Sequence, residues 1–342
     1  MTRERIVSGD VTTPEEESFI LSLRPKLLKE YIGQKALKDK LNVSIKAAQS
    51  RGESCEHVLF YGPPGLGKTT LAHIISNEMG TRLMATSGPA LSRTGDLMGI
   101  LTNMNEGDIL FIDEIHRLSP QIEEFIYPAM EDYKVDFVVD KGAFAKVINI
   151  PLKRFTLIGA TTRAGLLSPP LRDRFGLYYH IDFYDPSELK EIIIRSAGLL
   201  EVHIVPDAAE EIARRARGTP RVANRLLRRV RDYVTVKADG DITLELAKKA
   251  LDTEGIDTIG LDNLDRKFLK VIIDYYKGGP VGIDALGATL NEENDTLVDV
   301  VEPYLLKIGF LQRTKRGRMV SSSARAHLNL PLDDDTPQTK LF

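Results

Sequence analysis

Cysteine is nearly absent from the sequence: Cys55 is the single example, and this excludes an internal disulfide. A chain without disulfides suits a reducing compartment, so we expect a cytoplasmic protein. The opening residues, MTRERIVSGD, lack the apolar core of a signal peptide, and no stretch approaches the roughly 18 apolar residues that suggest a membrane span. For the same reason we expect no membrane partner. The six histidines are scattered and none belongs to an HExxH motif, so we expect no structural metal site.

An excess of charge of one sign is also missing. The 342 residues contain 46 lysines and arginines against 49 acids, which gives a net charge of −3. The chain as a whole is therefore not a polyanion binder, and any nucleic-acid site must be local. Hydrophobic residues make up 42% and charged residues 28%, an ordinary globular mixture for which two or three domains are expected at this length.

The most specific motif is GPPGLGKT at residues 62–69, which matches the phosphate-loop pattern G-x-x-x-x-G-K-[ST]. An apolar strand is predicted before it at 58–61 and a helix after it, which is the context the pattern requires. Glycines let backbone N–H groups approach phosphate oxygens, and the new helix points its positive end at the anion. Lys68 would reach the β- and γ-phosphates and the Thr69 hydroxyl would ligate Mg²⁺. A glycine-rich loop that binds nothing is the weaker interpretation.

A second acidic motif follows an apolar strand predicted at 108–112, which ends in Asp113-Glu114. An aspartate in this place is typical of a carboxylate that organises Mg²⁺, and the adjacent Glu114 can polarise an attacking water. Taken alone, Asp113 could instead be a helix N-cap. The phosphate loop upstream favours the metal.

Strand candidates alternate with helices through the first half of the chain and predict an α/β fold with a mostly parallel sheet. The candidates are 58–61, 82–86, 108–112, 155–162 and 178–183. Residues 135–150 read as a β-hairpin whose apolar side chains could belong to the core or to a surface for a partner.

The second half of the chain changes character at Asp185-Pro186 and is helical to about residue 255. Eight arginines and no acid occur from 214 to 231. We expect several of them to form a solvated helical face, with Arg221 best placed to reach a phosphate. The predicted division is a flexible arm at 1–20, an ATPase domain at 21–184, a helical domain at 185–255, a further domain at 256–332 and a disordered tail at 333–342.

Residues 256–332 have the plan of a winged helix, with helices at 262–276, 283–290 and 295–308 closed by a basic hairpin. Six lysines and arginines and no acid occur from 303 to 332. This local patch can release counterions from a phosphate backbone. A protein-docking role for the same fold stays open.

Five motifs, in order, carry a family resemblance over roughly residues 15–330: GPPGLGKTTLAHII, FIDEIHRLSP, GATTRAGLLSPPLRDRFG, RGTPRVANRLLRRVRD and GGPVGIDALG. They closely resemble the RuvB family, the bacterial Holliday-junction branch-migration motors among the AAA+ ATPases. The resemblance implies a P-loop ATPase domain with a parallel sheet, an all-helical lid and a C-terminal winged-helix domain. It also implies ATP and Mg²⁺, a homohexameric ring around duplex DNA, docking of RuvA through the 135–150 hairpin, and cooperation with the RuvC resolvase.

The resemblance also implies roles for individual residues. The expected nucleotide contacts are Leu23, Arg24, Gly65, Gly67, Lys68, Thr69, Thr70, Glu131, Asp132, Tyr133, Arg174, Tyr184 and Arg221. Thr69 and Asp113 would hold the metal, and Glu114 would activate water with help from Lys68. Thr161 or Thr162 matches the first sensor; Thr162 is carried forward as the catalytic candidate, although the sequence does not choose between the hydroxyls.

Arg174 matches the arginine finger given to a neighbouring subunit, with Arg172 less favoured, and Arg221 matches the second sensor. Arg313 and Arg318 match DNA contacts in the wing. Some relatives carry a further arginine where this chain has Asn294, so no contact is expected there.

Three rival functions share parts of this pattern: a clamp-loader or initiator switch, a protein-remodelling ATPase, and a non-enzymatic winged-helix regulator. The basic wing argues against the second, and the Asp113-Glu114 pair argues against the third.

Overall fold

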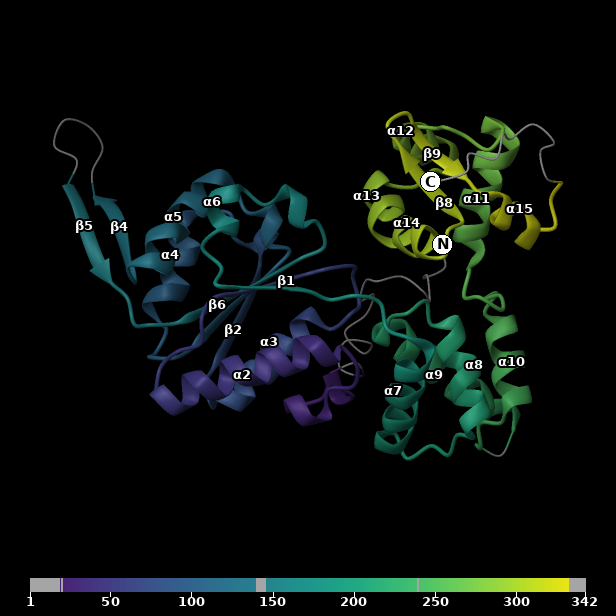
Figure 1. Cartoon of the computed structure of the whole chain (residues 1–342), viewed down its shortest axis with the longest axis horizontal. Helices are drawn as coiled ribbons and strands as arrows, with labels where there is room; N and C mark the ends of the chain where they lie inside the picture. Colours follow the sequence, from purple (N-terminus) through teal and green to yellow (C-terminus); the bar gives the residue numbers. More distant parts are fainter. Residues whose placement is uncertain (1–18, 20, 140–145, 239, 332–342) are drawn as a thin grey trace. The chain divides into compact units, whose positions relative to one another are not determined.

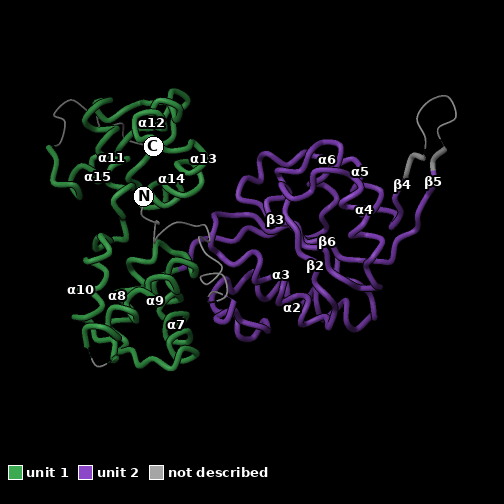
Figure 2. Tube along the Cα trace, turned by 180° about the vertical axis from the view of Figure 1, so that it is seen from behind, with its two compact units in different colours: residues 1–16, 185–342 green, residues 17–184 purple. Residues whose placement is uncertain are grey.

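The computed structural model describes residues 19, 21–139, 146–238 and 240–331. The flexible arm predicted at 1–20, apart from Phe19, and the tail predicted at 333–342 lie outside the described residues, as do residues 140–145 of the predicted hairpin. The chain divides into two compact units, with the boundary between Tyr184 and Asp185 (Figure 2). In chain order, the first unit here is residues 17–184 (purple, unit 2 in the key), and the second begins at Asp185 (green, unit 1 in the key). Within the described residues, no helix has both the length and the apolar composition needed to cross a membrane.

The first unit is built on a five-stranded parallel sheet in the order β2-β3-β6-β1-β7. The strands are β1 (Val58–Tyr61), β2 (Leu83–Ser87), β3 (Ile109–Asp113), β6 (Thr156–Thr161) and β7 (Leu177–His180). The helices are α2 (Lys35–Arg51), α3 (Lys68–Met79), α4 (Thr94–Thr102), α5 (Pro120–Glu131) and α6 (Pro169–Arg172). Figure 1 shows α2 and α3 running together along this unit. The parallel α/β fold predicted from the alternating pattern is confirmed.

The central strands are apolar because helices cover them. Every residue of β6 is buried, and Val58, Leu59 and Phe60 of β1 are at most 1% exposed. Gly159 lies where an added Cβ would come within 2.9 Å of the Leu59 side chain, so the tight packing of β6 on β1 needs a glycine there. Strands β1, β3 and β6 end at Tyr61, Asp113 and Thr161. Because the strands are parallel, the phosphate loop, the acidic pair and the candidate sensor hydroxyls follow at the same edge of the sheet.

The last strand is shorter than predicted. Residues 178–183 were expected to be extended, whereas β7 ends at His180. Its partner β1 ends at Tyr61, where the chain turns into the phosphate loop, and the last backbone bond of the pair runs from the Ile181 N–H to the Tyr61 carbonyl at 2.9 Å. Beyond that point β7 has no strand to pair with.

The predicted hairpin forms a separate two-stranded antiparallel sheet, β4 (Lys134–Val139) and β5 (Lys146–Pro151), which projects from the unit (Figure 1). Its apolar residues divide between the core and the surface, and whether the exposed ones meet a partner stays a prediction. Val135 is fully buried in the core cluster and Ile150 packs against that cluster, whereas Ile148 is 43% exposed.

The second unit contains a helical part followed by a winged helix. The helical part has α7 (Pro186–Leu199), α8 (Pro206–Arg215), α9 (Pro220–Lys237) and α10 (Leu244–Thr253). The winged helix has α11 (Asn263–Tyr276), α12 (Ile283–Leu290), α13 (Asn294–Thr296), α14 (Glu302–Lys307), β8 (Leu311–Thr314), β9 (Gly317–Val320) and α15 (Ser322–His327). The third predicted helix is continuous through a π-helical turn, η5 (Leu297–Val301), and α15 was not predicted.

The arginine-rich stretch differs from the expected solvated face. Arg215, Arg217 and Arg225 are only 2%, 3% and 6% exposed. Arg215 bonds Asp252 at 2.6 Å and the Ile256 carbonyl at 2.9 Å, and Arg217 pairs with the fully buried Asp265 at 2.9 Å. Arg217 is internal because an acid 48 positions away receives it, whereas Arg215 also pairs with the buried Glu211 four residues earlier, at 2.8 Å.

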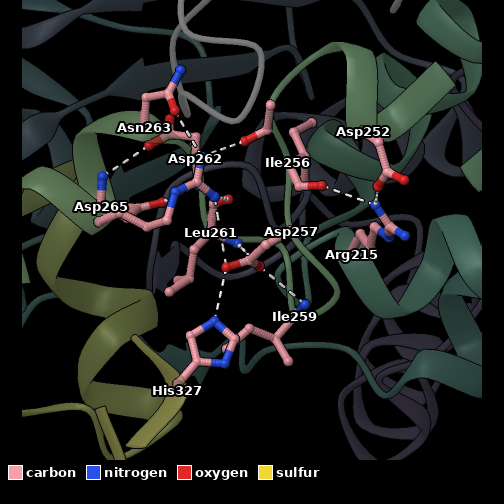
Figure 3. A network of polar contacts seen from close by, with 12 residues as sticks. Arg215, Asp252, Ile256, Asp257, Ile259, Leu261, Asp262, Asn263, Asp265 and His327 are labelled. Carbon is pink, nitrogen blue, oxygen red and sulfur yellow. Dashed lines mark hydrogen bonds and ion pairs between the residues drawn. The ribbon is translucent and has the colours of Figure 1, made fainter. Parts of the chain in front are cut away.

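The connector between the helical part and the winged helix is held by a polar network (Figure 3). The Asp257 carboxylate accepts the N–H groups of Ile259 and Leu261 at 3.1 and 2.8 Å and faces His327 at 2.9 Å. The connector is therefore tied to α15 as well as to α8.

Candidate phosphate-binding site and basic wing

The phosphate loop has the backbone that its glycines predict. Gly62, Gly65 and Gly67 have φ of 144°, 79° and 102°, in the region that side chains disfavour. At Gly62 an added Cβ would lie 2.2 Å from the Ile181 carbonyl oxygen, so this loop cannot close with another residue there. Helix α3 begins immediately afterwards at Lys68, which gives the loop the positive end of a 12-residue helix.

Lys68 and Thr69 have different partners at this turn. Lys68 is 7% exposed, and its ammonium donates to the carbonyls of Gly62 and Pro63 at 2.7 and 2.9 Å. The Thr69 hydroxyl lies 3.4 Å from Oδ2 of Asp113, and Oδ1 of Asp113 accepts the Glu114 N–H at 2.9 Å. A hydroxyl and a carboxylate oxygen side by side are ligands that Mg²⁺ prefers.

Glu114 is at the centre of a polar cluster. It has a left-handed backbone, with φ of 47°, which turns the chain directly after the strand. The Thr162 hydroxyl donates to its Oε2 at 3.2 Å, and Nδ1 of His116 lies 3.1 Å from the same oxygen. Burial, and then the charge of Asp113, raises the pKa of Glu114. The carboxylate is thus poised to accept a proton more readily than an exposed glutamate.

The two candidate sensor hydroxyls have different partners. Thr162 contacts Glu114, whereas Oγ1 of Thr161 lies 2.8 Å from Nδ1 of His116 and accepts the Arg163 N–H at 3.0 Å. His116 therefore connects Thr161 with Glu114. Sequence reasoning missed His116, and its one signal was its place two residues after the acidic pair, in the tight turn at 115–117.

Tyr184 is packed directly under the loop. Its hydroxyl donates to the Tyr31 hydroxyl at 2.6 Å and reaches the Leu66 carbonyl at 3.3 Å. An added Cβ at Gly67 would meet the Tyr31 hydroxyl at 3.2 Å, so Tyr31 also touches the loop, a contact that no motif in the sequence predicts. Leu23 is 3% exposed. Burial, and then the charge of Arg24, lowers the pKa of His73 on α3, so Arg24 lies near the loop helix.

Arg174, the candidate arginine finger, contacts Glu131, which was itself predicted to contact the nucleotide. It forms an ion pair with Glu131 at 3.1 Å, lies 4.4 Å over the Tyr127 ring and donates to the Pro170 carbonyl at 2.7 Å. Arg172, the less favoured finger, is about half exposed and sits 3.9 Å from Asp173.

The rest of the predicted 131–133 segment points to other partners. Asp132 pairs with Lys134 at 2.9 Å, and Tyr133 packs edge-on against Phe155 at 5.9 Å. Arg221 belongs to the second unit, in the first turn of α9 after the N-cap Thr219.

The basic wing places its two predicted DNA contacts opposite each other. Arg313 on β8 and Arg318 on β9 are register partners in the antiparallel pair. Both contact the carboxylate of Glu302, which is fully buried. The exposed fraction of the side chain is 46% for Arg313 and 17% for Arg318.

Three family models match consecutive parts of the chain. The Holliday junction DNA helicase RuvB P-loop domain matches residues 23–181, the RuvB AAA lid domain 184–257, and the RuvB C-terminal winged helix domain 258–329. These matches confirm the predicted combination of a P-loop domain, a helical lid and a winged helix.

Solved structures of RuvB proteins have the same fold. The Thermotoga maritima RuvB Holliday junction branch migration motor is 52% identical, with a TM-score of 0.84, and the match covers 91% of this chain and 99% of that one. A point variant of the same protein matches with a TM-score of 0.85, at the same identity and coverage.

Proposed function

The chain belongs to the RuvB family of Holliday-junction DNA helicases, and from that premise we propose how its residues divide the work of an ATP-dependent branch-migration motor. The first unit would bind and cleave ATP, and the wing would grip duplex DNA at the junction. The observation that carries the proposal is the continuous polar chain from Thr69 through Asp113 and Glu114 to Thr162.

Lys68, Thr69 and Asp113 form the phosphate and metal end of that chain. Thr69 would ligate Mg²⁺ directly and Asp113 would support its water shell, since both present oxygen atoms at the mouth of the loop. Bound Mg²⁺ would offset charge on the phosphate oxygens. Lys68, already aligned by two loop carbonyls, would add a positive charge at the β- and γ-phosphates.

Glu114 is the proposed general base. It would orient a water for in-line attack on the γ-phosphorus, and its raised pKa suits proton acceptance. Thr162 is the proposed first sensor because its hydroxyl already contacts the Glu114 carboxylate. A γ-phosphate that recruited this hydroxyl would release Glu114 toward the water.

The charge that develops in the transition state would be met from two further directions. Arg221 would reach the γ-phosphate from the lid, and Arg174 of a neighbouring subunit would act as the finger. Its contact with Glu131 supports placing residues 131–133 on the same subunit boundary as the finger. A finger in trans is worth about 10³–10⁵ in rate, so ATP cleavage would depend on assembly into a homohexameric ring.

The remaining nucleotide contacts would fix the base and sugar end. Arg24 acts on His73 of α3 from the N-terminal segment, next to the buried Leu23, and the Tyr184 hydroxyl contacts the Leu66 carbonyl of the loop. Tyr184 is also the last residue of the first unit, so it is suited to report the occupancy of the loop to the lid.

The partners follow from the surfaces that protrude. RuvA would dock on the hairpin β4–β5, where Ile148 is exposed while Val135 anchors the base of the hairpin in the core. RuvC would act on the junction that the ring moves. Wing contacts would be mainly to phosphates, because a motor must accept any sequence.

The decisive assay is ATP-dependent dissociation of a synthetic four-way junction, with and without RuvA. A motor should separate the junction in proportion to ATP consumed. A clamp-loader-like switch would hydrolyse ATP without sustained strand movement, and that result would refute the motor assignment for this chain.

A mixing experiment tests the finger. Arg174→Ala subunits keep an intact pocket, whereas Lys68→Ala subunits keep an intact finger, so mixed rings should recover turnover that neither variant has alone. Absence of recovery at every ratio, with both variants shown to enter rings, would remove the trans assignment.

A further inference from the structure

The two wing arginines share one buried acid. Glu302 begins α14, and its carboxylate is fully shielded from solvent. One oxygen accepts Nε of Arg318 at 2.8 Å, and the other is in direct contact with the guanidinium of Arg313. Both oxygens are therefore occupied by the residues expected to touch DNA.

This arrangement reduces the repulsion between the two wing arginines. Arg313 and Arg318 are directly opposite in the antiparallel pair, and like charges in that register repel. Glu302 neutralises one of the two charges and fixes both guanidinium groups, since an arginine fork bonds a carboxylate in a defined plane. A buried carboxylate is tolerated only when it is paired in this way.

The backbone of the wing is fixed as well. The Arg318 N–H donates to the Val281 carbonyl at 2.8 Å, and the Val281 N–H donates back to the Arg318 carbonyl at 3.0 Å. Val281 is 4% exposed and belongs to the core of the winged helix. Arg318 is thus held at both its backbone and its side chain.

We propose that Glu302 is a positioning residue for DNA binding, which aligns Arg313 and Arg318 so that their outward N–H groups meet backbone phosphates without first having to be ordered. This inference rests on the proposed role of the wing. The carboxylate lowers the positive charge of the wing and nevertheless strengthens its grip.

Two physical accounts predict opposite signs when Glu302 is neutralised. If only the number of charges mattered, Glu302→Gln would make the wing more positive, tighten DNA binding and steepen its salt dependence. If Glu302 positions the arginines, the same substitution weakens binding although positive charge is gained. Asp274→Asn is the matched control, because it makes the same change in net charge at an exposed site on α11 of the same winged helix.

The experiment measures binding of the full-length chain to two unrelated labelled duplexes across a salt series, with thermal melting to confirm that each variant is folded. We expect Glu302→Gln to bind both duplexes several-fold more weakly and to lose about one unit of salt slope, as for one lost phosphate contact. Asp274→Asn should bind as the parent chain does or slightly more tightly. Binding by Glu302→Gln that equals or exceeds that of Asp274→Asn would overturn the inference.

Arg313→Ala separates the two levels of the argument. If it weakens binding while Glu302→Gln does not, the wing role stands and the positioning role is wrong. If Arg313→Ala leaves binding unchanged, the wing assignment itself fails, and the inference fails with it.

A further variant keeps the inference testable if Glu302→Gln does not fold. Arg313→Lys retains the charge on a half-exposed side chain but removes the planar fork that Glu302 holds. We expect it to bind both duplexes more weakly than the parent chain. Parent-like affinity would contradict positioning by Glu302.

Discussion

Arg217 offers a direct test of the connection between lid and winged helix. It follows α8 with a left-handed backbone, φ 57°, and its guanidinium leaves the lid to pair with Asp265 of α11. It also donates to the Val300 carbonyl at 3.3 Å and lies 4.8 Å over the Tyr304 ring. Replacing Arg217 with methionine removes all three polar and ring contacts and leaves the backbone strain unchanged.

The size of the effect follows from burial. Arg217 and Asp265 are 3% and 0% exposed, and removing one partner of such a pair typically costs about 3–5 kcal/mol. Asp265 still accepts the Asp262 N–H at 2.9 Å, so we expect the lower end, about 3 kcal/mol. At about 1.4 kcal/mol per factor of ten, local opening should become roughly a hundredfold more frequent.

Hydrogen exchange followed by mass spectrometry measures that opening in the full-length protein. Peptides spanning the connector and the start of α11 should exchange roughly a hundredfold faster in Arg217→Met if the local opening energy sets their rate. Arg214→Met is the control, since that arginine lies three residues earlier, in the last turn of α8, with half of its side chain exposed. Asp265→Asn combined with Arg217→Met should cost much less than the sum of the single changes. Equal exchange in Arg217→Met and Arg214→Met, or additive costs, would refute the reasoning.

Two further outcomes are expected. His116→Ala should lower kcat for ATP by about 10- to 100-fold with little change in KM, because Glu114 and Thr161 lose their shared contact. His116→Asn should recover part of the loss. An unchanged kcat in His116→Ala would exclude the positioning role. His57 is buried, accepts the Leu157 N–H at 2.8 Å and has a lowered pKa, so the unfolded chain binds a proton at higher pH than the folded chain does. The free energy of unfolding should therefore fall as pH drops below 6.5, by at most about 1.4 kcal/mol per pH unit. Urea unfolding of His57→Gln should show a weaker dependence of stability on pH over that range.

The sequence was most informative where chemistry depends on adjacent residues. The phosphate loop, the Asp113-Glu114 pair and the winged-helix plan are local patterns, and the structure and the family matches agree with the fold that they predict. The end of β7 was wrong because strand length is set by a partner, β1, more than a hundred residues away in the chain.

Contacts between side chains that are far apart in the sequence could largely not be predicted. Tyr31 reaches the loop only because the chain brings it beside Tyr184, 153 positions later. His116 becomes notable only when β6 delivers Thr161 to it. Such contacts have no periodicity and no motif, so composition and spacing could not reveal them.

The arginines of this stretch have different structural places. Arg215 and Arg217 find Asp252 and Asp265, 37 and 48 positions away, and become internal supports of the lid and its connector. Arg221 lies one turn further on, after the Gly218 bend and the Thr219 cap, so the segment that ties the lid to the winged helix also carries the proposed second sensor. A change at the γ-phosphate that moved Arg221 would therefore pull on the same short loop that holds Asp265. The five residues from Arg217 to Arg221 are therefore our proposed connection between ATP cleavage and movement of the winged helix.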